Sequence, residues 1–544
     1  MSTLARYFHT VRHLRPIQVA GRARLLLPKP RPDLRVAPPL RSLTGPYVTP
    51  VAPAPTLVGP DVFQFLNVER RCSSAEDWQP RDASTLWTYN LHYFDDLNAR
   101  DAPRRTAWHQ SLLGRWVAEN PPANGRGWEP YPVSRRIVNW VKWAACGNAL
   151  PPECHASLAV QTRWLTNRLE YHILGNHLFA NAKALVHAGL YFDGSEAERW
   201  YTRGLDIIER ELREQVLPDG GHFERSTMYH AAAVEDLLDL INLMRAYGRR
   251  IPAKWETTLA QMQRWLRAMC HPDGDISFFN DAAFGVAPMP AELERYAAQL
   301  GLSVARDSTE PLVTLEASGY VRVVAGAACL ICDCAPVGPD YLPGHAHADT
   351  LSFEMSIGRQ RVFVNSGTSQ YGADEERQRQ RGTAAHNTVV IDGQNSSEVW
   401  AGFRIARRAR ARLWRATEAP TSVTVEASHD GYRRLPGRND HRRRWILDRH
   451  SLRVDDEITG EFRLAEAYFY LHPEIEAWPS TSREVILSWP QGASVRVVFE
   501  SAAAVEVRPS TWHPKFGVAL VNRCIVARLS GASLTTRVCW RGAQ

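Results

Sequence analysis

The chain has 544 residues, 44% of them hydrophobic and 23% charged, which are the proportions of an ordinary globular protein. This length requires two large domains or three smaller ones, and no apolar run is as long as the roughly 18 residues of a membrane-spanning helix. The net charge is +7, and residues 1–35 account for all of it, with eight basic residues and Asp33 as their one acid. The remainder is formally neutral, which disfavours a nucleic-acid partner.

The N-terminal 80 residues are expected to form a basic helix followed by a proline-rich arm. The apolar residues 25–27 are too few for the core of a standard secretory signal, and Pro28 and Pro30 follow them directly. By sequence alone the chain is therefore expected in the cytoplasm. The segment from about residue 28 to 60 is rich in proline and poor in periodicity, as in an extended arm. The basic face could be solvated, or it could contact a membrane surface or another protein.

The two larger segments differ in their periodicity. From about residue 87 to 300 apolar residues recur at helical spacing, as at Ile137, Trp140 and Val141, which indicates a helical bundle, solenoid or toroid. After about residue 318 come short runs rich in Val, Ile, Tyr and Phe, separated by turn residues, which is typical of a β-sandwich. We therefore predict an α+β multidomain fold, with a helical domain over 81–310 and a β-sandwich over 311–544.

Four segments combine reactive side chains with turn-forming residues. In one of them His345, His347 and Asp349 alternate, so that in an extended chain they share one face, and alternating histidines are a familiar spacing of metal ligands. The chain has neither a phosphate-binding glycine loop nor the elbow motif of serine hydrolases. Histidine, asparagine, tyrosine and arginine recur instead, and these residues suit the binding of a sugar acid. The four segments are residues 175–177, 219–230, 344–349 and 381–388.

Read in chain order, these and other segments resemble the heparinase II/III-like family of polysaccharide lyases. The resemblance covers roughly residues 80–410. It rests on residues 86–94, 127–132, 135–136, 279–283 and 397–400, together with the segments that contain His177, Tyr229, His345 and His386.

The resemblance implies an incomplete α/α toroid followed by an antiparallel β-sandwich, with the active site between the two. The activity implied is β-elimination, in which the C5 proton of a uronic acid is removed and the C4 oxygen is expelled. Asn176 and His177 would hold and neutralise the carboxyl group. Tyr229 would give or take the proton near the leaving oxygen, and His345 would be the base on one uronate epimer.

Further residues are expected to contact the polymer or to assist the tyrosine. A tyrosine has a reference pKa of about 10, so Tyr229 would need nearby cations to work as a base, and Arg225, Arg136 and His345 are candidates. The residues expected to bind substrate are Arg136, His222, Glu224, Arg225, Trp128 and Trp400.

The resemblance implies no required cofactor, although some relatives hold a metal inside the sandwich. The corresponding ligands would be His347, Asn365 and His386. An aspartate is usual at position 365, and an asparagine brings no charge, which weakens a structural zinc site. A second departure is Ala180, where some relatives carry a catalytic glutamate. Alginate-type and other uronate substrates therefore remain open beside the heparin type.

Three functions are compatible with these observations. The first is a lyase for an acidic polysaccharide, linked to bacterial exopolysaccharide metabolism and periplasmic by family resemblance. The second is a non-catalytic polysaccharide-binding or assembly protein of a surface-glycan pathway, which the missing signal favours. The third is a metal-dependent glycan hydrolase that uses His347 and His386.

Overall fold

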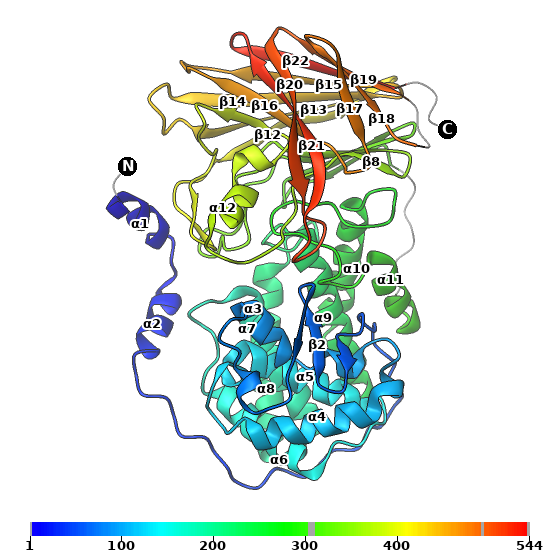
Figure 1. Ribbon diagram of the computed structural model, residues 1–544. Helices are drawn as coiled ribbons and strands as arrows, with labels where there is room; N and C mark the ends of the chain where they lie inside the picture. The colour runs from blue at the N-terminus through cyan, green and yellow to red at the C-terminus, as the bar shows by residue number, and fades with distance from the viewer. Residues whose placement is uncertain (1–2, 303–309, 491–493, 541–544) are drawn as a thin grey trace.

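The computed structural model describes residues 3–302, 310–490 and 494–540. A helical body and a body of stacked β-sheets lie end to end, and the N-terminal segment runs along one side of both (Figure 1). The predicted order, an α-helical domain followed by an antiparallel β domain, is confirmed. Among the described residues no helix combines the length and the apolar character that crossing a bilayer would take.

The N-terminal segment is more structured than expected. It forms two short helices, α1 (Thr3–Val11) and α2 (Pro16–Arg24), because Pro16 begins a new helix at its favoured first position. An extended arm then follows the helical body, where Arg41 N donates to Tyr191 O over 2.9 Å. A small sheet of β1 (Leu57–Gly59), β2 (Val62–Phe65) and β3 (Val68–Arg71) ends this segment. The sequence pattern did not predict these strands, which are too short to show alternation.

Helix α2 joins two loops that come from different domains. The Gln18 side chain is buried and donates from Nε2 to Ile173 O over 3.2 Å and to Tyr341 O over 3.3 Å. A Cβ added at Gly21 would stand 2.7 Å from His172 N, so the helix packs directly on that backbone. The segment before the helix that carries His177 is thereby tied to the loop that carries His345.

The helical body is built around one central helix. Helix α7 (Gly175–Tyr191) is buried along most of its length, as its apolar residues on all sides predict. It packs on α5 (Pro130–Ala145), α8 (Ser195–Gln215) and α9 (Thr227–Ala246). The other helices of the body are α3 (Thr85–Leu91), α4 (Thr106–Glu119), α6 (Pro152–Thr166), α10 (Ala253–Ala268) and α11 (Pro290–Gln299).

Buried charges cross the middle of the helical body. Lys142 Nζ on α5 and Lys183 Nζ on α7 both contact Asp239 Oδ2 on α9, at 2.9 and 2.7 Å. Burial alone would raise the pKa of the Asp239 carboxyl, but the two ammonium groups hold it well below its usual range. The three helices are therefore held in register by an ion network as well as by apolar packing.

Among its described residues the second domain contains three larger antiparallel sheets and a two-stranded one. The largest has the strand order β12-β13-β14-β15-β22-β19-β18-β17, a second has β20-β21-β16-β9, and a third has β4-β5-β6-β7-β8. Strand β15 alternates buried and half-exposed residues, as one side of a sandwich requires. The strands are β4 (Leu312–Leu315), β5 (Tyr320–Ala325), β6 (Ala328–Asp333), β7 (Phe353–Ile357), β8 (Gln360–Phe363), β9 (Val389–Ile391), β12 (Ala411–Glu418), β13 (Ser422–Tyr432), β14 (Asn439–Asp448), β15 (Ser451–Ile458), β16 (Ala465–Tyr470), β17 (Glu476–Thr481), β18 (Glu484–Ser488), β19 (Val495–Glu500), β20 (Ala502–Trp512), β21 (Leu520–Leu529) and β22 (Ser533–Trp540).

The five-stranded sheet joins the two domains, because apolar residues cover both of its faces. On β6, Leu330 and Cys332 face the sandwich core, whereas Cys329 and Ile331 pack against Trp265 of α10. The sequence of a strand that is covered on both faces is a continuous run of apolar residues. The helix α12 (Glu375–Arg381) and the short pair β10 (Val399–Trp400) and β11 (Arg404–Ile405) lie in the connections between β8 and β12.

Candidate active site

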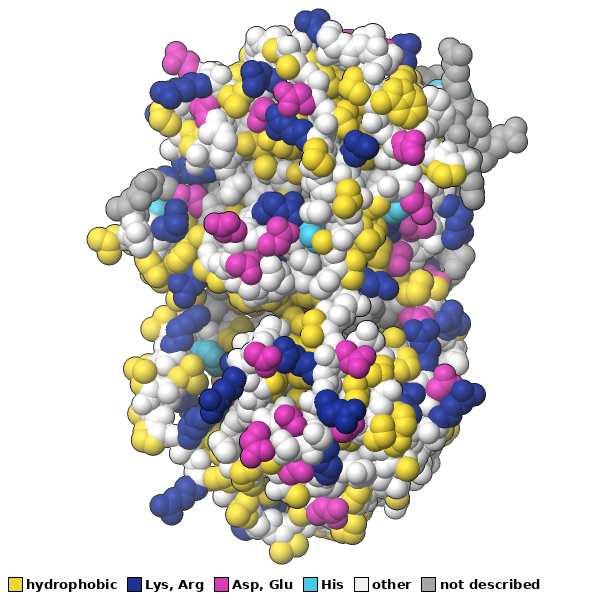
Figure 2. All heavy atoms as spheres, viewed as in Figure 1, with side chains coloured by type: hydrophobic (Ala, Val, Ile, Leu, Met, Phe, Trp, Pro, Cys, Tyr) yellow, Lys and Arg dark blue, Asp and Glu magenta, His cyan; other side chains and the backbone are white. Residues whose placement is uncertain are grey.

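The four predicted catalytic residues come from both domains and collect at their junction. Tyr229 lies in the first turn of α9, and its ring is 4.0 Å from that of His345, centroid to centroid. Asn176 and His177 occupy the first turn of α7. All four side chains are partly exposed, and the molecule narrows at this seam (Figure 2). Acidic and basic side chains are interspersed over the face in that view, so a polyanion site has to be local.

The start of α7 has an unusual backbone. Leu174 and Gly175 both have positive φ, at 72° and 57°, and a Cβ at Gly175 would stand 2.3 Å from Leu342 Cδ2 of the sandwich domain. Both the positive φ and the close approach favour glycine at this position. The turn places the amino end of α7, with its free N–H groups and Asn176, against the sandwich domain, and such a helix end favours anions.

Glu170 controls the charge of His177. Glu170 Oε1 is 3.0 Å from His177 Nδ1, and Asn181 Nδ2 donates to Glu170 Oε2 over 3.0 Å. The ring of Tyr131 packs on the imidazole at 4.5 Å. Burial opposes protonation, yet the Glu170 carboxylate raises the pKa of His177 above its ordinary value. His177 is thus prepared to meet an anionic group as an imidazolium. Neither Glu170 nor this pairing was predicted from the sequence.

Replacement of Glu170 by glutamine should lower the pKa of His177. The raised pKa keeps the imidazolium charged to higher pH, and without the carboxylate only the opposing effect of burial remains. The titration midpoint of the His177 ring in an NMR pH series should therefore move to lower pH. An unchanged His177 midpoint would show that Glu170 does not set this charge.

Asp281 is the centre of the hydrogen bonds on the sandwich side. Its Oδ2 is 2.8 Å from His345 Nδ1, its Oδ1 is 2.8 Å from His347 Nε2, and the Arg377 guanidinium binds both oxygens. Burial would raise the pKa of Asp281, but Arg377 and the two histidines hold it well below its usual range. The carboxylate accepts from His345 Nδ1–H, which leaves Nε2 as the nitrogen that can take a proton. The sequence marked the segment around Asp281 but not this role.

Tyr229 has a partner that the sequence did not indicate. Its hydroxyl is 2.8 Å from the hydroxyl of Tyr371, a residue of the loop before α12. Burial raises the pKa of both phenols well above the ordinary value. At neutral pH Tyr229 is therefore a phenol that can donate a proton. Of the three cations expected to assist Tyr229, His345 packs on its ring, whereas Arg225 and Arg136 bind other groups.

Two of the predicted polymer contacts are wrong. The Arg136 side chain is fully buried, donates to Gln161 Oε1 over 2.9 Å, and packs on the ring of Trp116. Trp128 is also buried in the helical body and donates from Nε1 to Asn120 O over 3.1 Å. Both side chains are buried and their nitrogens are already hydrogen-bonded within the helical body, so they stabilise that body and have no group left for a polysaccharide.

Three other predicted contacts serve mainly the architecture around the site. His222 is buried against Gln215 Oε1 at 3.1 Å. The Arg225 guanidinium donates from Nε to Ser318 O over 2.9 Å and so joins the two domains. Trp400 donates from Nε1 to Thr10 Oγ1 over 3.1 Å, so this ring packs on α1. Of the residues expected to bind substrate, Glu224 is the one whose carboxyl group interacts electrostatically with both His177 and His345.

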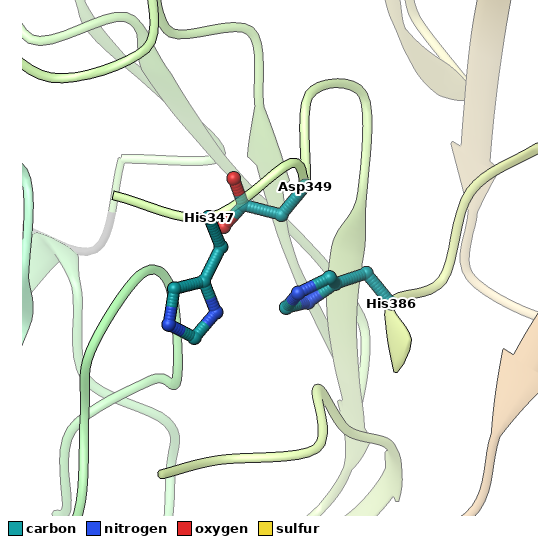
Figure 3. A group of neighbouring side chains, drawn as sticks. All are labelled: His347, Asp349 and His386. Carbon is teal, nitrogen blue, oxygen red and sulfur yellow. The ribbon is translucent and has the colours of Figure 1, made fainter. Parts of the chain in front are cut away.

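A second cluster lies behind Asp281 and could hold a metal. One ligand atom each from His347, Asp349 and His386 lies within 4.8 Å of the others, and the three side chains point toward one another (Figure 3). His347 Nδ1 and His386 Nε2 are buried without a hydrogen-bond partner among the described residues. Burial lowers the pKa of His347 to about 4 and that of His386 to about 3, so both are neutral, as metal ligands must be.

Asp349 joins the predicted ligands as a further candidate donor. Asn365, the third predicted ligand, lies in contact with the cluster, with its Oδ1 3.2 Å from His386 Nδ1. Asp349 offers a carboxyl group, which Asn365 lacks. Two neutral imidazoles and a carboxylate are a fitting donor set for zinc.

An α-helical toroid joined to an antiparallel sandwich, with tyrosine, histidine and asparagine at the junction, defines a known two-domain architecture. The family model of the heparinase II/III N-terminus matches residues 99–299, and that of the heparinase II/III-like C-terminal domain matches residues 307–541. The chain belongs to the heparinase II/III-like family.

Its relatives carry two kinds of name. A heparin-sulfate lyase of Bacteroides stercoris is 25% identical over 77% of this chain and 69% of the relative. The FtsZ-localized protein C of Caulobacter vibrioides is 27% identical over 70% of this chain and 66% of the relative. Among solved structures, a heparinase III superposes with a TM-score of 0.69 at 20% identity, covering 85% of this chain and 79% of the other. The structural likeness establishes the fold.

Proposed function

We propose that the protein is a polysaccharide lyase that cleaves a uronic-acid-containing polymer by β-elimination. The observation that carries this proposal is the ring of Tyr229 packed on that of His345 at the domain junction, with His345 Nδ1 bound to Asp281. A phenol and an imidazole held together in this way can act as an acid and a base on one substrate. The lyase names of several relatives support the same class of reaction.

The residues at the junction match the steps of the reaction. The C5 proton of a uronate is weakly acidic because its carboxyl group is already anionic, so the enzyme has to stabilise added negative charge on that group. Asn176 and the imidazolium of His177 supply hydrogen bonds and charge for this purpose. His345 Nε2 removes the C5 proton, and Tyr229 donates its proton to the leaving C4 oxygen. The bond from C4 to oxygen breaks as the double bond between C4 and C5 forms.

The masses of the products test this proposal. Purified protein would be incubated with heparan-type polymer, alginate, hyaluronan and bacterial exopolysaccharides, and the fragments weighed by mass spectrometry. Elimination divides the chain without adding water, whereas hydrolysis adds one water molecule for each bond that is cleaved. Fragments that carry added water would contradict the lyase proposal.

A non-catalytic role in a surface-glycan pathway is the second candidate. The relative from Caulobacter supports it, because that protein is named for its localisation and not for a lyase activity. The intact set of Asn176, His177, Tyr229 and His345 argues against it, since binding alone does not need an acid and a base. Binding of a polymer without any fragments would favour this candidate.

We also propose that His347, Asp349 and His386 hold a structural zinc ion. Asp281 accepts from His347 Nε2, and Asn365 contacts His386 Nδ1, so each imidazole is oriented from behind. When bound, the ion would fix the loop that also carries His345. Asp281 would then link this ion to the catalytic histidine.

Replacing His386 by alanine should abolish zinc binding. Wild-type protein dialysed against zinc and then against buffer should retain about one equivalent, because three donors are in place. The variant should retain none and should show no rise in its melting temperature on adding zinc. Asn365→Asp should bind more tightly than the wild type, because it adds a charge next to the site. If the wild type retains no zinc, the proposed zinc site is contradicted.

The basic N-terminal segment is proposed to contact an anionic membrane surface. Leu4 and Phe8 of α1 are largely exposed, and Arg6 and Arg12 lie beside them in the sequence. Sedimentation with vesicles that contain anionic lipid should deplete the wild type from solution. No depletion at low salt would discard this contact.

A further inference from the structure

Glu224 is a buried acid for which the fold provides no partner. The residue precedes α9, is 2% exposed, and neither of its carboxyl oxygens has a hydrogen-bond partner among the described residues. A buried polar group normally has a partner, because leaving a carboxylate dry and unpaired is very costly. The absence of a hydrogen-bond partner indicates that the Glu224 carboxyl group serves to contact a bound ligand.

The carboxyl group of Glu224 lies beside the amino end of α7. Its Oε1 is 3.3 Å from the position that a Cβ on Gly175 would take, one residue before Asn176. Leu342 and Phe223 also reach this position, so the surroundings are partly apolar. The acid is therefore next to the two residues that are proposed to hold the uronate carboxyl group.

Titratable groups of several elements surround Glu224. His177 of α7 and His345 of the sandwich loop favour its ionised form, whereas Asp281 disfavours it. An ionised Glu224 also contributes to raising the pKa of the Tyr229 and Tyr371 phenols. Burial is the largest influence and raises the pKa of Glu224 above its ordinary value in spite of the two histidines.

We propose that Glu224 acts as a neutral carboxylic acid that donates its proton in a hydrogen bond to the uronate carboxylate, beside Asn176 and His177. This inference rests on the proposed function and names a third group that neutralises the substrate. An ionised Glu224 would repel the uronate, whereas an O–H donor to a carboxylate forms one of the stronger hydrogen bonds. The bond strengthens as negative charge builds up on the uronate carboxyl group during removal of the C5 proton.

Two substitutions separate this role from that of a base. Glu224→Gln keeps a neutral donor of the same shape and should retain kcat/KM within about tenfold of the wild type. Glu224→Ala removes the donor and should lower kcat/KM by about 100-fold or more. Glu211→Gln is the matched control, since Glu211 is buried on α8 and already accepts from Gln215 Nε2 over 2.9 Å. Equal losses in Glu224→Gln and Glu224→Ala would overturn the proposal, and so would full activity in both.

A second measurement needs no substrate. In protein labelled with carbon-13 at the glutamate carboxyl carbons, the signal that is missing from Glu224→Gln belongs to Glu224. This signal should have the shift of a protonated acid at pH 6, about two units above the reference pKa of glutamate. A signal with the shift of a carboxylate at that pH would overturn the proposal even if the enzyme is active. If the signal is that of a protonated acid but the protein cleaves no polymer, the result counts against the lyase function. The protonation of Glu224 would still be confirmed.

Discussion

Replacing Asp281 by alanine should cost about 3–5 kcal/mol of stability, because it leaves the buried guanidinium of Arg377 without its counter-charge. His345 and His347 would lose their partner in the same step. The unfolding transition in urea, followed by tryptophan fluorescence, should move to lower concentration. Any activity of the variant should fall as well, since nothing then fixes the nitrogen with which His345 faces the substrate.

A matched control is available on the surface. Asp82 pairs with Arg70 at 2.8 Å but is largely exposed, so Asp82→Ala should leave the unfolding transition where it is in the wild type. If Asp281→Ala unfolds at the same urea concentration as Asp82→Ala, the network around Asp281 does not hold the sandwich side of the site. A loss of stability in Asp281→Ala that is absent from Asp82→Ala would therefore be specific to the buried carboxylate.

Removing the Tyr229 hydroxyl should lower kcat by about 10²–10⁴-fold, the usual contribution of a positioned acid. The KM should change little, because in the proposed mechanism the phenol acts on the leaving oxygen, whereas Asn176 and His177 bind the carboxyl group. The ring and its packing on His345 remain in Tyr229→Phe, so the variant should fold normally. Initial rates on a polymer that the wild type cleaves would provide the comparison.

Tyr371→Phe is the natural companion to this variant. It removes the partner of the Tyr229 hydroxyl but leaves the hydroxyl itself, and should cost only about tenfold in kcat, the value of one hydrogen bond. A larger loss in Tyr371→Phe than in Tyr229→Phe would assign the proton donor to Tyr371. If kcat falls only slightly and equally in both variants, neither tyrosine donates the proton.

The parts of the site that lie in short segments could be predicted from the sequence. Asn176 and His177 are neighbours at the start of one helix, and the alternation of His345, His347 and Asp349 indicates a shared face without any knowledge of the fold. The order of helical and β segments follows from periodicity alone. These features are local, and the structure confirms the fold.

Contacts between distant segments were not predictable in this way. Asp281 and Arg377 are 96 residues apart, and Tyr229 and Tyr371 are 142 apart, so no periodicity relates them. Arg136 illustrates the opposite error, because a local motif does not tell whether a guanidinium faces a groove or a core. The carboxyl group of Asp349 lies close to His347 and His386, and the packing of the loops that brings His386 to them could not be predicted from the sequence.

The most direct test of the lyase proposal is the absorbance of a 4,5-unsaturated uronate during incubation with acidic polysaccharides. The elimination proposed for Tyr229 and His345 would create this double bond, so the wild type should produce a rising ultraviolet band on at least one polymer, and Tyr229→Phe should not. Reducing ends that appear without the band, or bound polymer without either signal, would contradict the assignment of this protein as a lyase.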